Sequence, residues 1–418
     1  MAIPRDPSFD SSLALAAEGN TFISRRCERL GSDIFLTRLM LQKVVCMLGE
    51  EAAHVFYERG RMTRRGAMPK TTFWLLGDEG SVQSLDDGAH RARKGMFMSL
   101  MEPESRHRLA ELTMGAWRRH LEGWRQQDGV VLLDEVQEVL CRAVCAWAGV
   151  PLDEDDVAER TCEFRAMIDG AGTIGPRSWR ALMRRRRTER WIEALIARVR
   201  AGDLEVDDDS PLGDIAWHRE PDGQLLPPEA AAVEVINLLR PTVAIARFVT
   251  FAALALHEHP TWRERLAAGA DRELEVFTQE VRRFYPFFPV VGGRVREPFE
   301  WRGHQFHVGA WVLLDLYGTD HDPRIWDRPE AFDPDRFRNF EITPYNLVPQ
   351  GGGDHDTGHR CPGEWVVIDL MKTVLRLLTA TMTYDVPPQD LEVDLSRMPT
   401  APASGFVIAN VRPVSDRS

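Results

Sequence analysis

Cys361 stands in a segment whose residue types could do chemistry. It belongs to the loop GGGDHDTGHRCPG, residues 351–363, which precedes an apolar helical pattern from Glu364 to about Leu378. Three consecutive glycines permit close approach of the backbone to something flat and bulky, because no Cβ intrudes. A cysteine just before a helix faces the positive end of the helix dipole, which favours a thiolate over a thiol. Such a thiolate could be a metal ligand, a nucleophile or a redox centre.

The residues of this loop leave further interpretations open. A zinc site would need three or four closely spaced ligands, and His355, His359 and Cys361 qualify, although the chain has no second cysteine cluster. A nucleophilic cysteine would need a His and an Asn or Asp from distant parts of the sequence. The chain has 12 histidines, so this interpretation stays open. A buried structural cysteine is the simplest alternative.

Arg240 and Pro241 form a second chemically suggestive pair. They stand in the middle of a helical pattern from Glu229 to Glu258, which would be ~45 Å long at ~1.5 Å rise per residue. Proline inside a helix costs about 3 kcal/mol, and a charge among apolar neighbours is costly unless it is paired. Two such costs side by side indicate a site; an arginine paired internally at a kink is the alternative.

Three motifs together resemble the cytochrome P-450 superfamily. The first is His359-x-Cys361-x-Gly363, the heme-binding loop of that family, in which the cysteine is the thiolate ligand of the iron. The second is the Glu280-x-x-Arg283 pair, and the third is the segment Pro334-Asp335-Arg336-Phe337, whose arginine completes a triad with that pair in the family. The resemblance extends from about Ile34 to about Val411.

The chain also departs from the usual pattern of the superfamily. Asp354 stands where the loop usually has Phe, and Thr357 where it usually has Gly. No Asp or Glu occurs from Val235 to Thr250, where most members carry an acid–alcohol pair that delivers protons. The Arg-Cys-Pro-Gly-Glu run and the Arg240-Pro241 pair instead resemble one branch, the fatty-acid peroxygenases.

This resemblance implies a cofactor and its ligands. It implies heme b with an iron whose axial thiolate is Cys361, so that Cys361 is the metal ligand. It also implies contacts to the heme propionates from His359, His90, Lys94 and Arg64. His90 and Lys94 are spaced i, i+4 and so share one helix face, where two cations could hold an anionic group.

The resemblance further implies the substrate site. Arg240 would hold the carboxylate of a long-chain fatty acid through its planar guanidinium, with Pro241 beside it and Gln83 on the same side of the heme. The bulky segment after the Glu280 helix would shape the pocket, and its residues are Phe287, Phe288, Pro289 and Val290.

The expected reaction is hydroxylation at the α or β carbon with hydrogen peroxide, in which the substrate carboxylate acts as general acid–base. A redox partner would then not be required. Three alternatives remain: a decarboxylase that gives terminal alkenes, a monooxygenase fed by NAD(P)H through redox partners, and a non-catalytic heme-thiolate sensor.

Composition limits the other classes of protein. The 418 residues are 44% hydrophobic and 28% charged, which is typical of a globular protein, and the net charge of −12 argues against a nucleic-acid partner. The run Arg184–Arg187 is expected to be a solvated helix face. No signal peptide or membrane anchor is evident, and the six cysteines lack disulfide-type spacing, so we expect a cytoplasmic protein.

The elements that must position these residues are mainly helical. The pattern predicts a cytochrome P-450 fold, mainly α with small β-sheets, in which heme is buried between the long central helix and the Cys361 loop. Paired strands are expected at 34–40 and 43–48 and a helix at 50–59, within a small β-rich region of about 34–80. No linker divides the chain, so residues 1–418 are expected to form a single domain.

Overall fold

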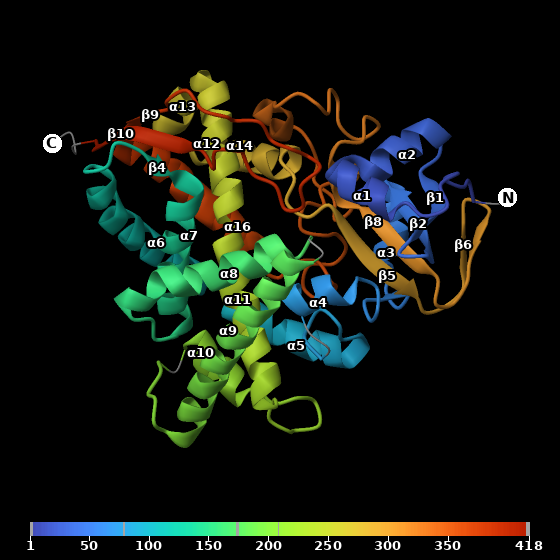
Figure 1. The fold of residues 1–418 in the computed structure, drawn as a ribbon, viewed down its shortest axis with the longest axis horizontal. Helices are drawn as coiled ribbons and strands as arrows, with labels where there is room; N and C mark the ends of the chain where they lie inside the picture. The colour runs from blue at the N-terminus through green and yellow to red at the C-terminus, as the bar shows by residue number, and fades with distance from the viewer. Residues whose placement is uncertain (1–2, 78–79, 173–174, 208, 415–418) are drawn as a thin grey trace.

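A five-stranded sheet lies at one side of the molecule and helices make up most of the rest (Figure 1). The computed structural model describes residues 3–77, 80–172, 175–207 and 209–414. The sheet order is β1-β2-β8-β5-β3, from strands Ile34–Leu39, Gln42–Leu48, Trp311–Asp315, Val290–Val295 and Met62–Thr63. Strands β2 and β8 are parallel, and the other neighbours are antiparallel.

The expected strand pair is confirmed as the hairpin β1–β2, in register from Ile34↔Met47 to Leu39↔Gln42. Its two-residue turn, Met40-Leu41, has positive φ at both residues, which matches the right-handed twist of the strands. The sheet is not confined to residues 34–80, however, because β5 and β8 come from residues 290–315. Hydrophobic alternation predicts a strand but not its distant partner.

The chain forms two smaller sheets as well. One has the order β4-β10-β9, from Val130–Val131, Val407–Pro413 and Met382–Asp385, and the other pairs β6 (Phe299–Trp301) with β7 (His304–Phe306).

Helices form the larger part of the core, as predicted. They are α1 (Ser12–Glu18), α2 (Phe22–Leu30), α3 (Glu50–Tyr57), α4 (Lys70–Leu76), α5 (Asp87–Leu100), α6 (Pro103–Trp124), α7 (Leu132–Ala148), α8 (Val157–Gly170), α9 (Pro176–Ala201), α10 (Pro211–Trp217), α11 (Pro228–Ala244), α12 (Ala246–Glu258), α13 (Pro260–Ala267), α14 (Asp271–Phe284), α15 (Leu316–Asp320) and α16 (Glu364–Arg376). Short 3₁₀ turns occur at Gly19–Thr21, Glu154–Asp156 and Pro334–Arg338, and α16 continues into a π-helical turn at Leu377–Thr381.

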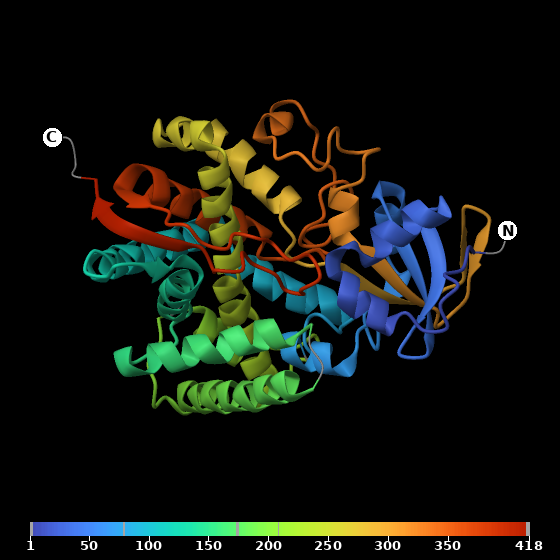
Figure 2. The ribbon, with the colours of Figure 1, turned by 45° about the horizontal axis from the view of Figure 1, so that its top comes forward.

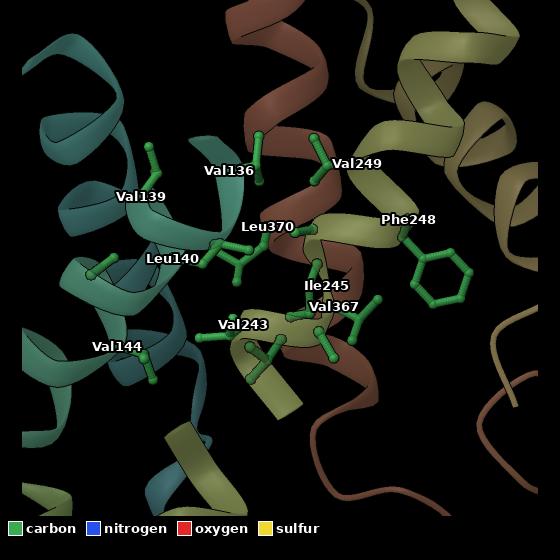
Figure 3. Close-up of a cluster of buried hydrophobic side chains, with 14 of the residues drawn as sticks. Val136, Val139, Leu140, Val144, Val243, Ile245, Phe248, Val249, Val367 and Leu370 are labelled. Carbon is green, nitrogen blue, oxygen red and sulfur yellow. The ribbon is translucent and has the colours of Figure 1, made fainter. Parts of the chain in front are cut away.

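The predicted long helix is two helices, α11 and α12, that meet at Ile245. Pro241 lies four residues before the junction and cannot donate a hydrogen bond to the carbonyl of Asn237, which weakens the helix there. The pair crosses the molecule, and side chains of α7, α11, α12 and α16 pack around the junction (Figure 3). Pro228–Glu258 is long and apolar enough to cross a bilayer, but 94% of its most apolar window is buried, as in a core helix.

Candidate active site

The Cys361 loop lies directly before α16. The Cys361 N–H donates to the carbonyl of Gln350 at 3.2 Å, and its side chain is a half-buried free thiol. The three glycines do make close approaches, but to Tyr57 and a backbone oxygen. A Cβ at Gly353 would lie 2.9 Å from the Tyr57 Cβ, and one at Gly352 would lie 2.6 Å from the carbonyl oxygen of Pro344. Packing within the chain therefore already requires glycine at these positions, and the contact to a flat ligand stays a prediction.

The prediction that Cys361 is biased toward the thiolate was wrong for the protein alone. Burial raises the pKa of Cys361, and the Lys94 cation and the Gly363 N–H only partly offset this effect. The burial of the first turn of α16 outweighs the effect of the helix dipole on the thiol. A thiolate at this position therefore needs a cationic partner such as a metal ion.

A buried ion cluster fixes the start of α16. Glu364 pairs with Arg282 of α14, and it accepts a hydrogen bond from the Arg360 Nε at 2.6 Å. Burial opposes ionisation, but the guanidiniums of Arg282 and Arg360 lower the pKa of Glu364 to about 2. Glu364 thus joins the Cys361 loop, through Arg360, to α14, through Arg282.

The predicted Glu280 triad is confirmed. Arg283 and Glu280 are fully buried and joined by two hydrogen bonds of 2.8 Å, and Arg336 lies 3.2 Å from the same carboxylate. This triad joins α14 to the 3₁₀ turn at Pro334–Arg338.

Four cationic or titratable side chains converge near Cys361. The rings of His90 and His359 lie 4.0 Å apart, Lys94 donates to the Arg360 carbonyl, and Arg64 donates to the Gly292 carbonyl at 2.6 Å. Burial, together with repulsion by Lys94 and Arg64, lowers the pKa of His90 to about 4, and burial lowers the pKa of Lys94 to about 8.

None of these four side chains has a carboxylate partner among the described residues. Burial and repulsion by Arg64, His90 and Lys94 also lower the pKa of His359. A cluster of donors that repel one another fits a dianionic group, and two heme propionates have this chemistry. By contrast, among the described residues no group of three His, Cys, Asp or Glu side chains is placed to hold a metal ion, so the zinc interpretation is not supported.

Arg240 is a buried guanidinium held by neutral groups. It is 4% exposed and donates to the carbonyls of Leu75 at 3.1 Å and Leu76 at 2.7 Å, and to Asn237 Oδ1 at 3.1 Å. Burial and repulsion by Arg185 lower the pKa of Arg240 to about 9, against the attraction of Glu234. Among the described residues it has no carboxylate within hydrogen-bonding distance, so the internally paired arginine considered from sequence is excluded there.

Asn237 links Arg240 to Gln83. Its Nδ2 donates to Gln83 Oε1 at 3.2 Å and to Glu234 Oε2 at 2.8 Å. Glu234 is fully buried, pairs with Arg93 of α5 and accepts from the Val82 N–H at 2.8 Å. Sequence reasoning missed Asn237 and Glu234. The available signal was their spacing of three residues, 234, 237 and 240, which places them along one helix face.

Pro241 marks accessible space beside Arg240. From Ala231 to Leu256 every residue is buried except Pro241, which is exposed. Phe287 stacks on Phe248 of α12 with ring centroids 4.3 Å apart, and Phe288 is 37% exposed. Pro289 and Val290 lead into β5, where Val290 pairs with Asp315. Phe287 thus lies against α12, but among the described residues no contact joins these four side chains to Arg240.

Comparisons with known proteins identify the family. A sequence profile of the cytochrome P-450 family matches residues 274–401. A variant of Cytochrome P450SP alpha (CYP152B1) is 47% identical, with a TM-score of 0.95 over 97% of this chain and 100% of that chain. The chain belongs to the cytochrome P-450 superfamily, in its fatty-acid peroxygenase branch.

Two structures of similar proteins contain fatty acids. Cytochrome P450EX alpha (CYP152N1) with myristic acid is 43% identical to this P-450, with a TM-score of 0.95 over 99% of this chain and 100% of that chain. A variant of cytochrome P-450 OleT in complex with arachidonic acid is 34% identical, with a TM-score of 0.97 over the full length of both chains.

More distant relatives match over shorter lengths. Rhazimal synthase of Alstonia scholaris is 28% identical over 200 residues, which are 41% of this chain and only 39% of that protein. Cytochrome P-450 71D94 of Mentha gracilis is 22% identical over 376 residues, which are 79% of this chain and 75% of that protein. This P-450 is an oxidoreductase whose cofactor is heme with thiolate-ligated iron, and its fold is that of P-450 structures that contain fatty acids.

Proposed function

We propose that this P-450 uses hydrogen peroxide to hydroxylate long-chain fatty acids at the α or β carbon, without a redox partner. The observation that carries the proposal is Arg240, a buried cation without a carboxylate partner among the described residues, next to accessible surface at Pro241. A fatty-acid carboxylate supplies the missing negative charge. The complexes of the similar proteins with myristic and arachidonic acid support this substrate class.

The cofactor residues follow from the same geometry. Cys361 would be the axial thiolate, and His90, His359, Lys94 and Arg64 would face the propionates. When bound, heme supplies the oxidising chemistry that places an oxygen atom of peroxide into a C–H bond.

The substrate carboxylate replaces a proton-delivery group that the chain lacks. No Asp or Glu occurs from Val235 to Thr250. A carboxylate held by Arg240 accepts a proton from peroxide and returns it to the departing oxygen atom, which is general base and then general acid catalysis. Because the head group is anchored, carbons 2 and 3 are the ones nearest the reacting centre. Gln83 and Asn237 orient the guanidinium and its ligand.

The first test is product analysis. Heme-loaded protein is mixed with a saturated long-chain acid and hydrogen peroxide, with no reductase present. A 2- or 3-hydroxy acid supports the proposal, whereas a terminal alkene indicates the decarboxylase. Product only with NAD(P)H and a reductase indicates the conventional monooxygenase, and no product under either condition indicates the sensor.

The second test is removal of the anchor. Arg240→Ala should lower kcat/KM for long-chain acids at least about 100-fold, which is about 2.7 kcal/mol of transition-state stabilisation. Its heme absorption spectrum should be unchanged. Thr242→Val is the matched control, because among the described residues the Thr242 hydroxyl bonds only the Leu238 carbonyl of its own helix, and it should retain turnover. Wild-type kcat/KM in Arg240→Ala would refute the anchoring role.

A further inference from the structure

Helices α9 and α4 both carry exposed apolar side chains. Trp179 and Met183 are 65% and 62% exposed, and their spacing of four residues places them on one face of α9. Trp74 of α4 is 42% exposed. The two helices pack together, because buried Arg185 of α9 donates to the Trp74 carbonyl, and the adjacent carbonyls of Leu75 and Leu76 bind Arg240.

Helix α9 is strongly basic in an acidic protein. From Pro176 to Ala201 it has nine arginines and two glutamates, a balance of +7 in a chain whose net charge is −12. Arg180, Arg184 and Arg186 are exposed and have no carboxylate partner among the described residues. Arg187 is different, because it pairs with Glu159 of α8. Figure 2 shows α9 beside α8 along one edge of the molecule.

This combination fits an anionic lipid surface. Tryptophan is favoured at the boundary of headgroups and acyl chains, and arginines beside exposed apolar side chains attract anionic headgroups. An acidic protein or nucleic acid would explain the arginines but not the two exposed tryptophans and Met183. The run Arg184–Arg187, expected to be a solvated helix face, is solvated except at Arg185. Its two arginines without a carboxylate partner among the described residues, Arg184 and Arg186, leave positive charge on that face.

We propose that the exposed face of α9, formed by Trp179, Met183 and the exposed arginines of that helix, docks this P-450 on anionic bilayers. Docking needs no membrane anchor. It places α4, and therefore the cradle of Arg240, next to the membrane that holds fatty acids. This role in substrate delivery rests on the proposed function, whereas the binding itself does not.

The test measures binding of the heme-loaded protein to vesicles by sedimentation. Vesicles that contain phosphatidylglycerol should bind the wild type, and vesicles of phosphatidylcholine alone should bind it much more weakly. Arg180→Gln/Arg184→Gln should weaken binding roughly 30-fold, from two lost charges near the surface at about 1 kcal/mol each. Trp179→Ser/Met183→Ser should also weaken it. The matched control is Arg118→Gln/Arg119→Gln on α6, which removes two exposed charges elsewhere and should leave binding unchanged.

Other results would overturn the proposal. Equal loss in the α6 control would show a general effect of net charge. Loss with the arginine variant but not with the Trp179 variant would show a polyanion site rather than a lipid surface. Dimers in light scattering that disappear in Trp179→Ser/Met183→Ser would show that the face binds a second copy of this chain. Absence of peroxide-driven turnover would refute the proposed function and leave the vesicle result unaffected.

Discussion

Arg240 differs from the other buried arginines of the site in what surrounds it. Arg282 and Arg283 each have a buried glutamate, Glu364 and Glu280, whereas Arg240 is held by carbonyl and amide oxygens. Neutral acceptors orient a guanidinium without neutralising it. Its charge is therefore available to a ligand, and Asn237 controls the direction in which it points.

The residue-scale prediction concerns Asn237. Asn237→Ala removes one hydrogen bond to the Arg240 cation, and such a bond is worth about 1.5–3 kcal/mol, so KM for a long-chain acid should rise about tenfold or more. Asn237→Asp should raise KM further, because its carboxylate pairs with Arg240 and competes with the substrate. Steady-state kinetics with peroxide measure both. If another group anchors the acid, KM will not rise in the order wild type, Asn237→Ala, Asn237→Asp.

Sequence alone could predict a site at Arg240 and Pro241, because a charge and a proline are both unfavourable inside an apolar helix. It did not single out Glu234 and Asn237, because their spacing of three residues, although it places them on one helix face with Arg240, is equally typical of a solvated face. What buries them is Arg93 from α5 and the Val82 backbone, and these tertiary contacts leave no trace in the local pattern.

At the scale of elements, the sequence predicted the order of the helices and strands better than it predicted which distant segments pack against each of them. The Cys361 loop, the start of α16 and the Glu280 triad are where the motifs indicated. The direction of the Cys361 pKa was wrong, because burial depends on packing by distant segments. The predicted long helix extends over Pro228–Glu258, and what the sequence did not place is its interruption at Ile245, since the effect of a proline on its helix depends on how neighbours pack around it.

An element-scale prediction concerns Asp315, the last residue of β8, whose carboxylate caps α15 by accepting from the Gly318 N–H at 2.7 Å. Burial raises the pKa of Asp315 to about 7, above its unfolded value of 3.8. The folded state then binds more protons between these values, so stability should fall as pH rises from about 4 to 7, by up to about 1.4 kcal/mol per pH unit.

Asp315→Asn should flatten this pH dependence and be more stable relative to wild type at pH above 7 than below it. Urea unfolding at a series of pH values measures the effect, with the exposed Asp128→Asn variant as control. A parallel pH profile in wild type and Asp315→Asn would show that the carboxyl is ionised in the folded protein throughout.

At the scale of the whole molecule, distant segments of the chain share one sheet and one site. The largest hydrophobic cluster fills the helical part, and two smaller clusters lie on the five-stranded sheet. Strands from residues 34–63 pair with strands from 290–315, and the cation cluster combines Arg64, α5 and the Cys361 loop. A single cooperative domain remains the prediction for residues 1–418.

We therefore expect heme-loaded protein to unfold in one thermal transition, because heme contacts would join elements that already share the core. Far-ultraviolet circular dichroism and heme absorbance should change at the same midpoint, which is the usual criterion for cooperative unfolding. An earlier loss of strand signal, with heme absorbance intact, would divide the chain into two units.

The charge of α9 has a consequence that precedes any contact. With +7 on this helix, the remaining residues carry −19, so positive charge is concentrated on α9 as on one end of an electric dipole. A negatively charged surface exerts a torque on such a dipole, within a screening distance of about 8 Å at physiological salt. Protein molecules that diffuse toward such a surface would therefore be oriented before contact, with α9 facing the surface and the acidic remainder of the protein facing away.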